Sequence, residues 1–428
     1  MRRPNPAVRP EDALAAWDAA RPSAAPAPVI VKCKLMTPMY GGGATPGEVD
    51  RAMPIRASAI RGQLRFWWRL LNDGGLHPQE LFAAEAELWG GISGTGPRAS
   101  KVTLQVGGRP VGPDEMVGWK SQPGTPRYAL ILDPGADPPR LLDAGYEFTL
   151  TLRFSKAADD AQFKQVIEAL RWWASFGGVG ARTRRGLGAV QVTSPDVSLQ
   201  PVSREEVESR GGRMELRARP NRALDAWKNA VEALEYFRQG EDVGRNPGRG
   251  RHPGRSRWPE PDTIRRRTNA HAPGHEPKHP ASGFFPRAAF GLPIVFQFKD
   301  SNRGDPRGQG GKSLTLEPTD TVDERQRPVQ RDRMASPMIL RPYFDGTQYR
   351  PLALLLPGWE QRVSVSVDLD SDRVGPAWPT NSGEQEKQAA LVPPMQGRGS
   401  DALTAFLHYF EHHAREHHGR GGRGRGGR

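Results

Sequence analysis

The sequence predicts an α+β protein in which helices cover one face of antiparallel sheets. Over roughly the first 195 residues, segments with strand alternation and segments with helical period follow in the order strand, helix, several strands, helix and strand. That order is typical of an α+β sandwich. Glycine (49) and proline (41) together make up about a fifth of the 428 residues, which predicts long irregular segments between the elements.

The first half of the chain carries the clearest periodic patterns. After a flexible arm rich in Pro and Ala at residues 1–28, residues 29–35 (VIVKCKL) alternate as a strand does. Residues 55–72 and 159–175 each place apolar side chains on one helical face: Ile60, Leu64, Trp67 and Leu71 in the first, and Phe163, Val166, Ile167 and Leu170 in the second. We also expect a short helix at 78–89 and strands near 101–106, 128–132, 146–154 and 189–192.

The second half alternates folded patterns with polar stretches. Helices are expected at 223–238 and 400–418, and strands at 214–219, 290–299, 336–341, 352–356 and 363–369. The elements therefore group into two domains, residues 29–200 and 213–418. The second domain carries insertions at 240–282 and 300–333, which we expect to be exposed and flexible because large apolar residues are few there. Residues 419–428, GRGGRGRGGR, form a low-complexity Gly/Arg tail.

Composition points to an anionic partner. The formal net charge is +13 and the sequence pI is about 10.1, which favours a polyanion such as nucleic acid. Cys33 is the single cysteine, so the chain can form neither an internal disulfide nor a cysteine-based zinc site, as suits a reducing cytoplasm. The N-terminus lacks the apolar region of a secretory signal, and no apolar stretch is long enough to cross a membrane.

Three arginines form a stripe along the first predicted helix. Arg61, Arg65 and Arg69 are spaced four residues apart, and like charges at this spacing destabilise an isolated helix by a few tenths, about 0.2–0.5 kcal/mol per pair. An anionic partner should offset this repulsion. Either an RNA phosphate backbone supplies it, or carboxylates elsewhere in the fold do so, with Glu85 and Glu87 as the candidates.

A glycine- and arginine-rich loop follows the second long helix, at residues 176–188. Glycines allow backbone N–H groups to approach an anion closely, and arginines contact phosphates in a bidentate manner. Thr183 stands where a dinucleotide-binding fingerprint starting at Gly178 requires glycine, so the loop is not such a fingerprint. The alternative is a surface hairpin with incidental arginines.

The sequence contains no complete enzyme or metal-binding motif. Pro306 stands where a phosphate-binding loop ending in Lys312 needs glycine, and Thr95 replaces the last glycine of a nucleophile elbow. Two sets of histidines, at 271–279 and 412–418, are expected to be solvated rather than metal ligands. We therefore expect no catalytic residue, no metal site and no cofactor.

Several segments together resemble a known family. The residues Thr37-Pro38-Met39-Tyr40-Gly41-Gly42, the helix containing Arg61-Gly62-x-x-Arg65-x-Trp67-Trp68-Arg69, and the loop at 176–188 look like the RAMP superfamily of CRISPR proteins, and in particular the first subunit of type III-B Cmr complexes. Residues 286–294 and 333–342 add to this resemblance, which covers roughly 29–195 and 283–360.

The resemblance implies two ferredoxin-like domains related to the RNA-recognition fold. It also implies a non-catalytic subunit that caps a filament of Cmr or RAMP subunits near the 3′ side of a guide CRISPR RNA and helps to bind target RNA in antiviral defence. The residues that we expect to contact RNA are arginines and loop glycines: Arg56, Arg61, Arg65, Arg69, Gly177, Gly178, Gly180, Arg182, Arg184, Arg185, Arg287 and Arg341.

Two other functions stay open from the sequence. A RAMP endoribonuclease that processes guide RNA precursors would need a general base, and His77 is the candidate in a folded region. A general RNA-binding protein of the RGG type would owe most of its RNA affinity to the tail at 419–428.

Overall fold

The computed structural model describes residues 27–93, 96–119, 125–131, 137–218, 222–249, 253–281, 283–298, 313–322, 328–329 and 331–413. Its internal contacts divide the chain into two compact units. The first unit comprises Met1–Trp119, Pro139–Ala181 and Gly188–Pro201, and the second comprises Lys120–Pro138, Arg182–Leu187 and Val202–Arg428. The expected arm at 1–28, except for residues 27–28, and the Gly/Arg tail lie outside the described residues.

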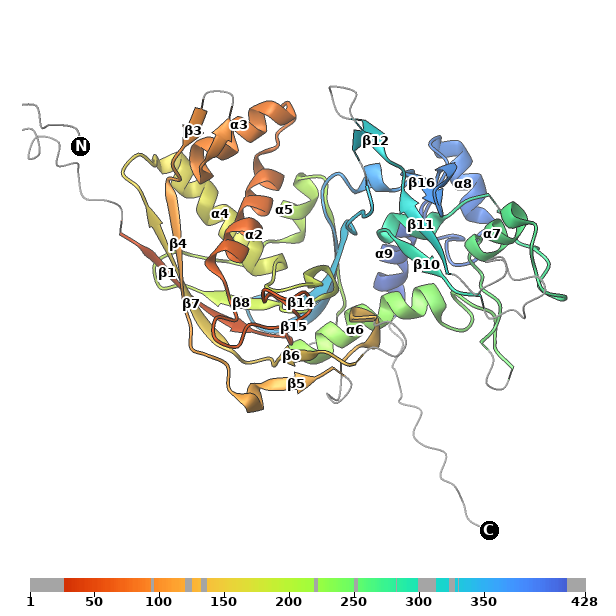
Figure 1. The fold of residues 1–428 in the computed structure, drawn as a ribbon, viewed down its shortest axis with the longest axis horizontal. Coiled ribbons are helices and arrows are strands. Elements are labelled where there is room, and N and C mark those ends of the chain that lie inside the picture. The colour runs from red at the N-terminus through yellow and green to blue at the C-terminus, as the bar shows by residue number, and fades with distance from the viewer. Residues whose placement is uncertain are drawn as a thin grey trace, which may run out of the picture. The chain divides into compact units, whose positions relative to one another are not determined.

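The first unit is built on an antiparallel sheet with the strand order β4-β7-β1-β8. Along the chain the elements run strand, helix, strand, strand, helix, strand, which is the ferredoxin-like arrangement. Figure 1 shows the two long helices on one face of this sheet. The strands are β1 (Val29–Leu35), β4 (Val102–Gly107), β7 (Glu147–Phe154) and β8 (Val190–Thr193), and the helices are α2 (Ala57–Asn72) and α4 (Asp160–Phe176).

Aromatic side chains join the two helices of this unit. The ring of Trp67 on α2 lies 6.0 Å from that of Trp172 and 6.0 Å from that of Phe176, both on α4. β1 alternates buried and exposed side chains along its whole length, as its sequence predicts. The tryptophan pairs late in the two helices therefore serve the core of the unit.

The remaining elements of the first unit are short. α3 (Pro78–Trp89) begins at His77, whose Nδ1 accepts from the Gln79 N–H at 3.4 Å while Glu80 accepts from the His77 N–H at 3.1 Å. His77 therefore acts as a helix cap. Two two-stranded antiparallel sheets complete the unit, β2 (Gly91–Ser93) with β3 (Gly96–Arg98), and β5 (Met116–Gly118) with β6 (Arg140–Leu142); η1 (Pro113–Glu115) precedes β5.

The second unit contains a three-stranded antiparallel sheet with the order β14-β15-β9. The helices α6 and α9 pack on it. The order repeats the arrangement of the first three strands in the first unit, and the described residues hold no fourth strand in this sheet. The elements are β9 (Arg213–Leu216), α6 (Ala223–Gln239), β14 (Met338–Phe344), β15 (Tyr349–Leu355) and α9 (Ala402–His412), with α5 (Arg204–Ser209) ahead of β9.

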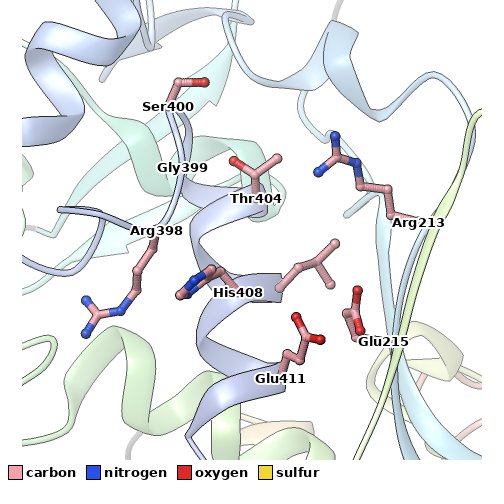
Figure 2. Close-up of a pocket in the computed structure, with 9 residues that line it drawn as sticks. Arg213, Glu215, Arg398, Gly399, Ser400, Thr404, His408 and Glu411 are labelled. Atoms are coloured by element: carbon pink, nitrogen blue, oxygen red, sulfur yellow. The ribbon is translucent and has the colours of Figure 1, made fainter.

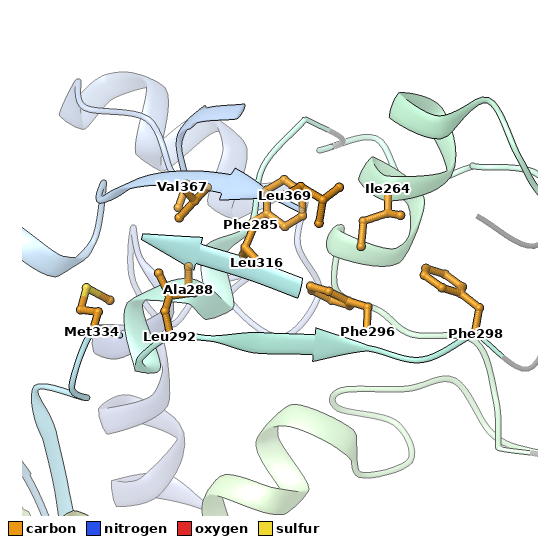
Figure 3. Packing of buried hydrophobic residues seen from close by; sticks show 11 residues of the cluster. Ile264, Phe285, Ala288, Leu292, Phe296, Phe298, Leu316, Met334, Val367 and Leu369 are labelled. Atoms are coloured by element: carbon orange, nitrogen blue, oxygen red, sulfur yellow. The ribbon is translucent and has the colours of Figure 1, made fainter. Parts of the chain in front are cut away.

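A second antiparallel sheet of the same unit has the order β10-β11-β16-β17. Figure 3 shows the apolar cluster beside it, in which Phe285, Leu316 and Val367 are fully buried. The elements are α7 (Glu260–Thr268), η4 (Pro286–Phe290), β10 (Ile294–Phe296), β11 (Leu314–Pro318), β12 (Thr321–Val322), β13 (Pro328–Val329), η5 (Trp359–Arg362), β16 (Ser366–Leu369), β17 (Asp372–Pro376) and α8 (Ser382–Ala390).

The segment 240–282 differs from the expectation of an exposed, flexible insertion. Trp258 and Ile264 are buried, and Asp262 is only 4% exposed. The Asp262 carboxylate accepts from Arg255 at 2.8 Å and from the backbone N–H groups of Lys278 and His279 at 2.9 Å each. Two apolar anchors and one well-paired carboxylate order a stretch whose composition is mostly polar. Within 300–333, residues 300–312, 323–327 and 330 lie outside the described residues.

The strand expected near residues 128–132 is not formed over residues 128–131, the part that the structure describes. Arg127–Ala129 instead make a 3-10 turn, η2, in which the Tyr128 side chain is buried. The guanidinium groups of Arg185 and Arg238, in the same unit, lie 5.9 and 5.7 Å from the centroid of its ring. The tertiary packing of this aromatic ring thus overrides the local strand pattern.

Among the described residues, no helix is long and apolar enough to cross a membrane.

Candidate nucleic-acid interface

Arg61 on α2 is bonded to other parts of its own unit. Its guanidinium donates to the backbone carbonyl of Val102 at 3.0 Å, to the Ser100 hydroxyl at 3.0 Å and to the carbonyl of Trp89, and it lies 5.8 Å from the Trp89 ring. Partial burial, and then the neighbouring charge of Arg65, lower the pKa of Arg61. The side chain thus ties α2 to the end of α3 and the start of β4.

Arg65 and Arg69 meet at one carboxylate. Glu85, which is 3% exposed, accepts from Arg65 Nε at 2.6 Å and from Arg69 Nη1 at 2.5 Å through the same oxygen. The expected alternative of an ion pair with Glu85 is therefore confirmed, whereas Glu87 pairs with Lys101 at 2.7 Å and Arg98 at 3.7 Å. The side chains of Arg65 and Arg69 remain 33% and 42% exposed, so each still presents N–H groups to solvent.

Arg56 precedes α2 and pairs loosely with an acid. Its Nη2 lies 3.6 Å from Asp50, and both side chains are about one-third exposed (34% and 35%). The pKa of Asp50 is lowered, first by the backbone N–H of Met53 and also by Arg56. Arg56 is thus accessible to an anion from solvent.

The loop glycines serve close packing within the first unit. Gly180 has φ 78°, and a Cβ there would lie 2.6 Å from the Tyr40 carbonyl oxygen, while a Cβ at Gly177 would collide with the Trp173 ring. The N–H of Gly177 donates to the Trp173 carbonyl at 2.7 Å, and the Gly178 carbonyl accepts from Trp173 Nε1 at 3.3 Å. Several backbone polar groups of this loop are therefore already bonded to protein atoms.

The three loop arginines lie in different environments within the second unit. Arg182 is exposed and adopts the left-handed conformation with φ 60°. Arg184 donates to the carbonyl of Ser336, and burial lowers its pKa. The guanidinium of Arg185 lies 5.9 Å from the ring centroid of Tyr128. Arg182 is thus the loop arginine that is open to an external anion.

Arg185 belongs to a group that we call the Tyr128 arginine cluster, made of Tyr128, Arg185, Arg238, Arg287 and Glu260. The guanidinium of Arg238, at the end of α6, also lies near this ring, 5.7 Å from its centroid. Arg287 lies 3.1 Å from the fully buried carboxylate of Glu260. Within the cluster, three guanidinium groups therefore accompany one carboxylate.

This excess of positive charge lies in a poorly solvated region. Nη1 of Arg185 and Nε of Arg238 are buried and find no hydrogen-bond partner in the described part of the chain. Burial lowers the pKa of Arg185 to about 10, with Arg238 and Arg182 acting in the same direction, and burial also lowers the pKa of Arg238. These buried N–H groups are out of reach of solvent, so an external anion would meet the charge of the cluster through the exposed Arg182, whose own charge acts on Arg185.

Sequence reasoning found Arg185 and Arg287 but missed the rest of the cluster. Tyr128 was expected in a strand. Arg238 lies at the end of a helix in whose sequence no functional motif was found. Nothing in the local patterns brings α6, α7, η2 and the loop together, so only the tertiary structure identifies the group.

Arg341 occupies the interior of β14. Its side chain is 1% exposed, its Nε donates to the Pro342 carbonyl at 3.0 Å, and burial lowers its pKa to about 9. In this structure it has no surface to offer to RNA, contrary to the expectation for an RNA contact, because side chains on both faces of β14 are buried.

His279 of the histidine set at 271–279 is bonded to backbone groups. Its Nδ1 accepts from the Ala281 N–H at 3.1 Å, and its Nε2 lies 3.1 Å from the Arg257 carbonyl. Across the described ranges, no three His, Cys, Asp or Glu side chains gather in a way that could hold a metal ion.

The part of the chain that contains the ferredoxin-like sheet and the glycine-rich loop is similar to a known family: residues 32–191 match the model of the RAMP superfamily. Among solved structures, the chain is similar to apo Cmr1 from Pyrococcus furiosus, with 14% identity, coverage of 82% of this chain and 100% of that chain, and a TM-score of 0.41. It is also similar to a subunit of the type III-B Cmr-beta complex bound to cognate target RNA, with 10% identity, coverage of 86% and 98%, and a TM-score of 0.42. No curated protein matches the sequence.

Proposed function

We propose that this chain is an RNA-binding subunit of a type III-B CRISPR effector complex, which contacts guide RNA and target RNA without cutting either. The observation that carries the proposal is the Tyr128 arginine cluster, in which three guanidinium groups accompany one carboxylate close to the exposed Arg182. The RAMP match over residues 32–191 and the net charge of +13 support it. Other RAMP subunits are the expected protein partners.

Phosphate contact explains why such a cluster would persist. Arginine has a planar group that meets phosphate oxygens in a bidentate manner and stays charged even when it is buried. The exposed Arg182 would contact the phosphate directly. The buried charges of Arg185 and Arg238 would add a positive electrostatic potential at that position. Contacts of this kind position an RNA strand and carry little base information.

The test compares two arginines that carry the same charge. In the full chain, Arg182→Gln should weaken binding to a fluorescently labelled single-stranded RNA regardless of its sequence. The slope of log K against log salt should fall by about 0.7 to 1 unit. Arg222→Gln is the matched control, because Arg222 lies in the same unit, is 88% exposed and pairs with Asp225. Equal effects of the two variants would reject a site at the loop.

The complex itself supplies the second test. Purification of the tagged full chain from its native cell should bring down other RAMP proteins and short RNAs that share a repeat-derived end. Labelled repeat RNA incubated with the chain and a chelator should stay intact. Recovery of mixed cellular RNA without protein partners would contradict the proposal, and so would cleavage that is lost in His77→Ala.

A further inference from the structure

A cavity of about 370 Å³ lies in the second unit and belongs to none of the contacts described so far. Residues of β9, of α9 and of the segment leading into α9 line it, and Figure 2 shows their side chains gathered around it. Its volume is in the range that holds a small ligand such as one nucleotide. Both carboxylates and arginines line it, so the kinds of group that a ligand must present can be inferred.

Two carboxylates lie at one side of the cavity, Glu215 from β9 and Glu411 from α9. Glu215 accepts from Arg204 at 2.8 Å, and its pKa is raised by burial and also by the negative charge of Glu411. Glu411 is exposed. An ionised carboxylate is only an acceptor, so a ligand at this side must present N–H or O–H donors.

Two cations also line the cavity, Arg213 from β9 and Arg398 from the segment ahead of α9. Arg213 points into the cavity in Figure 2, with its guanidinium 5.5 Å from the Trp359 ring. The stacking holds the group in place while leaving its N–H edge available. An anionic part of the ligand would be bound here.

An apolar side chain and an aromatic ring, those of Leu407 and His408, also line the cavity. Leu407 is buried, and the His408 ring stacks on His412 at a centroid distance of 4.2 Å and an interplanar angle of 23°. The pKa of His408 is lowered by burial, and the positive charges of His412 and Arg398 act in the same direction, whereas Glu411 opposes them. At neutral pH the imidazole is therefore an uncharged aromatic ring, suited to contact a planar base.

We propose that this cavity binds one guanosine nucleotide of an RNA strand, with the phosphate at Arg213 and the guanine edge at Glu215 and Glu411. Guanine carries two adjacent donors on its Watson–Crick edge, the N1–H and the N2 amino group, which match a carboxylate. Adenine and cytosine pair one amino donor with an acceptor, and uracil flanks its single N–H with two acceptors, so each of them would place an acceptor against a carboxylate. The RNA origin of the nucleotide rests on the function proposed above.

The first experiment titrates the full chain with 5′-GMP, 5′-AMP, 5′-CMP and 5′-UMP by calorimetry. GMP should bind at least about 10-fold more tightly than the others, a difference of about 1.4 kcal/mol. Glu411→Gln should abolish this preference, and Arg213→Gln should weaken the binding of all four nucleotides. Glu386→Gln, at an exposed carboxylate of α8, is the matched control and should change neither. Circular dichroism verifies that each variant is folded.

The second experiment separates an RNA nucleotide from a free one. An RNA octamer with a single guanosine should bind more tightly than octaadenylate, and Glu411→Gln should remove that difference while leaving octaadenylate binding intact. Absence of GMP binding in a chain that binds RNA would overturn the pocket assignment alone. GMP binding without any RNA affinity would instead overturn the proposed function, and equal binding of all four nucleotides would overturn the guanine assignment.

Discussion

Arg65 on α2 donates through Nε to Glu85 of α3 at 2.6 Å, and Glu85 is almost completely buried. Arg69 donates to the same oxygen. The repulsion between Arg65 and Arg69, which would destabilise an isolated helix, is therefore offset within the first unit by one carboxylate of a neighbouring helix. These arginines therefore stabilise the fold in the absence of RNA, and their substitution should change stability as well as any RNA affinity.

Removal of the Glu85 carboxylate should destabilise the chain. Glu85→Ala leaves two arginines without their shared acceptor, and the free energy of unfolding should fall by about 1–3 kcal/mol, as measured by urea denaturation. Glu87→Ala is the control, since Glu87 is 42% exposed, and its loss should be smaller. Equal losses would contradict the structural role. If Arg65 and Arg69 also contact RNA, Glu85→Gln should raise RNA affinity by freeing them.

Charge reversal at Arg61 should disrupt the first unit rather than report on RNA. Arg61→Glu would face the Trp89 and Val102 carbonyls with a carboxylate, so the melting temperature should fall well below that of the wild type. Arg56→Glu is the control on an accessible side chain, and it should melt close to the wild type. An unchanged melting temperature in Arg61→Glu would show that these hydrogen bonds contribute little to stability.

Cys33 should behave as a buried probe of unfolding. The thiol lies on β1 at 2% exposure, and burial raises its pKa to about 12. Thiolate is the reactive form, so a thiol reagent at pH 8 should label native protein very slowly and denatured protein rapidly. Mass spectrometry of quenched samples measures the two rates. Rapid labelling of the native chain would mean that β1 opens readily.

Two substitutions of Asp401 should separate the effect of helix capping on stability from the effect of burying its carboxylate. Its carboxylate accepts from the Leu403 and Thr404 N–H groups at 2.8 and 3.0 Å at the start of α9, so Asp401→Ala should cost about 1 kcal/mol of unfolding free energy. Asp401→Asn keeps a capping oxygen and serves as the comparison.

The pH dependence of that comparison has a definite sign. Burial raises the pKa of Asp401 above its ordinary value of 3.8. A folded-state pKa that is raised means a contribution to stability that is complete below the unfolded pKa and is lost as pH rises through the folded pKa. The stability of the wild type relative to Asp401→Asn should therefore decline upward from about pH 4. Urea titrations across this range measure it, and a flat difference would contradict the burial.

Much of the local structure could be predicted from the sequence. The helix α3 has the predicted bounds, α2 and α4 lie within one or two residues of theirs, and β1 matches its predicted range. These segments have strong periodicity and clear ends. The strand expected near Tyr128 failed because a short apolar run gives no such period, and packing against two arginines decided its conformation.

The site was harder to predict than the fold. Arg341 was correctly expected in a strand, but the sequence does not show that both faces of β14 are buried. Arg61 and Arg182 look equally basic in the sequence, yet the first is bonded to backbone carbonyls and the second is exposed. The difference depends on which carbonyls and carboxylates other segments bring near each guanidinium.

The sequence by itself determined the helices and most strands, the basic charge and the glycines on which the loop depends, because each follows from residue type and short-range spacing. Only the tertiary structure decided that Arg185 and Arg238 share Tyr128, and that Glu215 and Glu411 line one cavity. Side chains distant in sequence meet only after sheets and helices have packed. Burial then fixes which charges are paired and which remain available to a ligand.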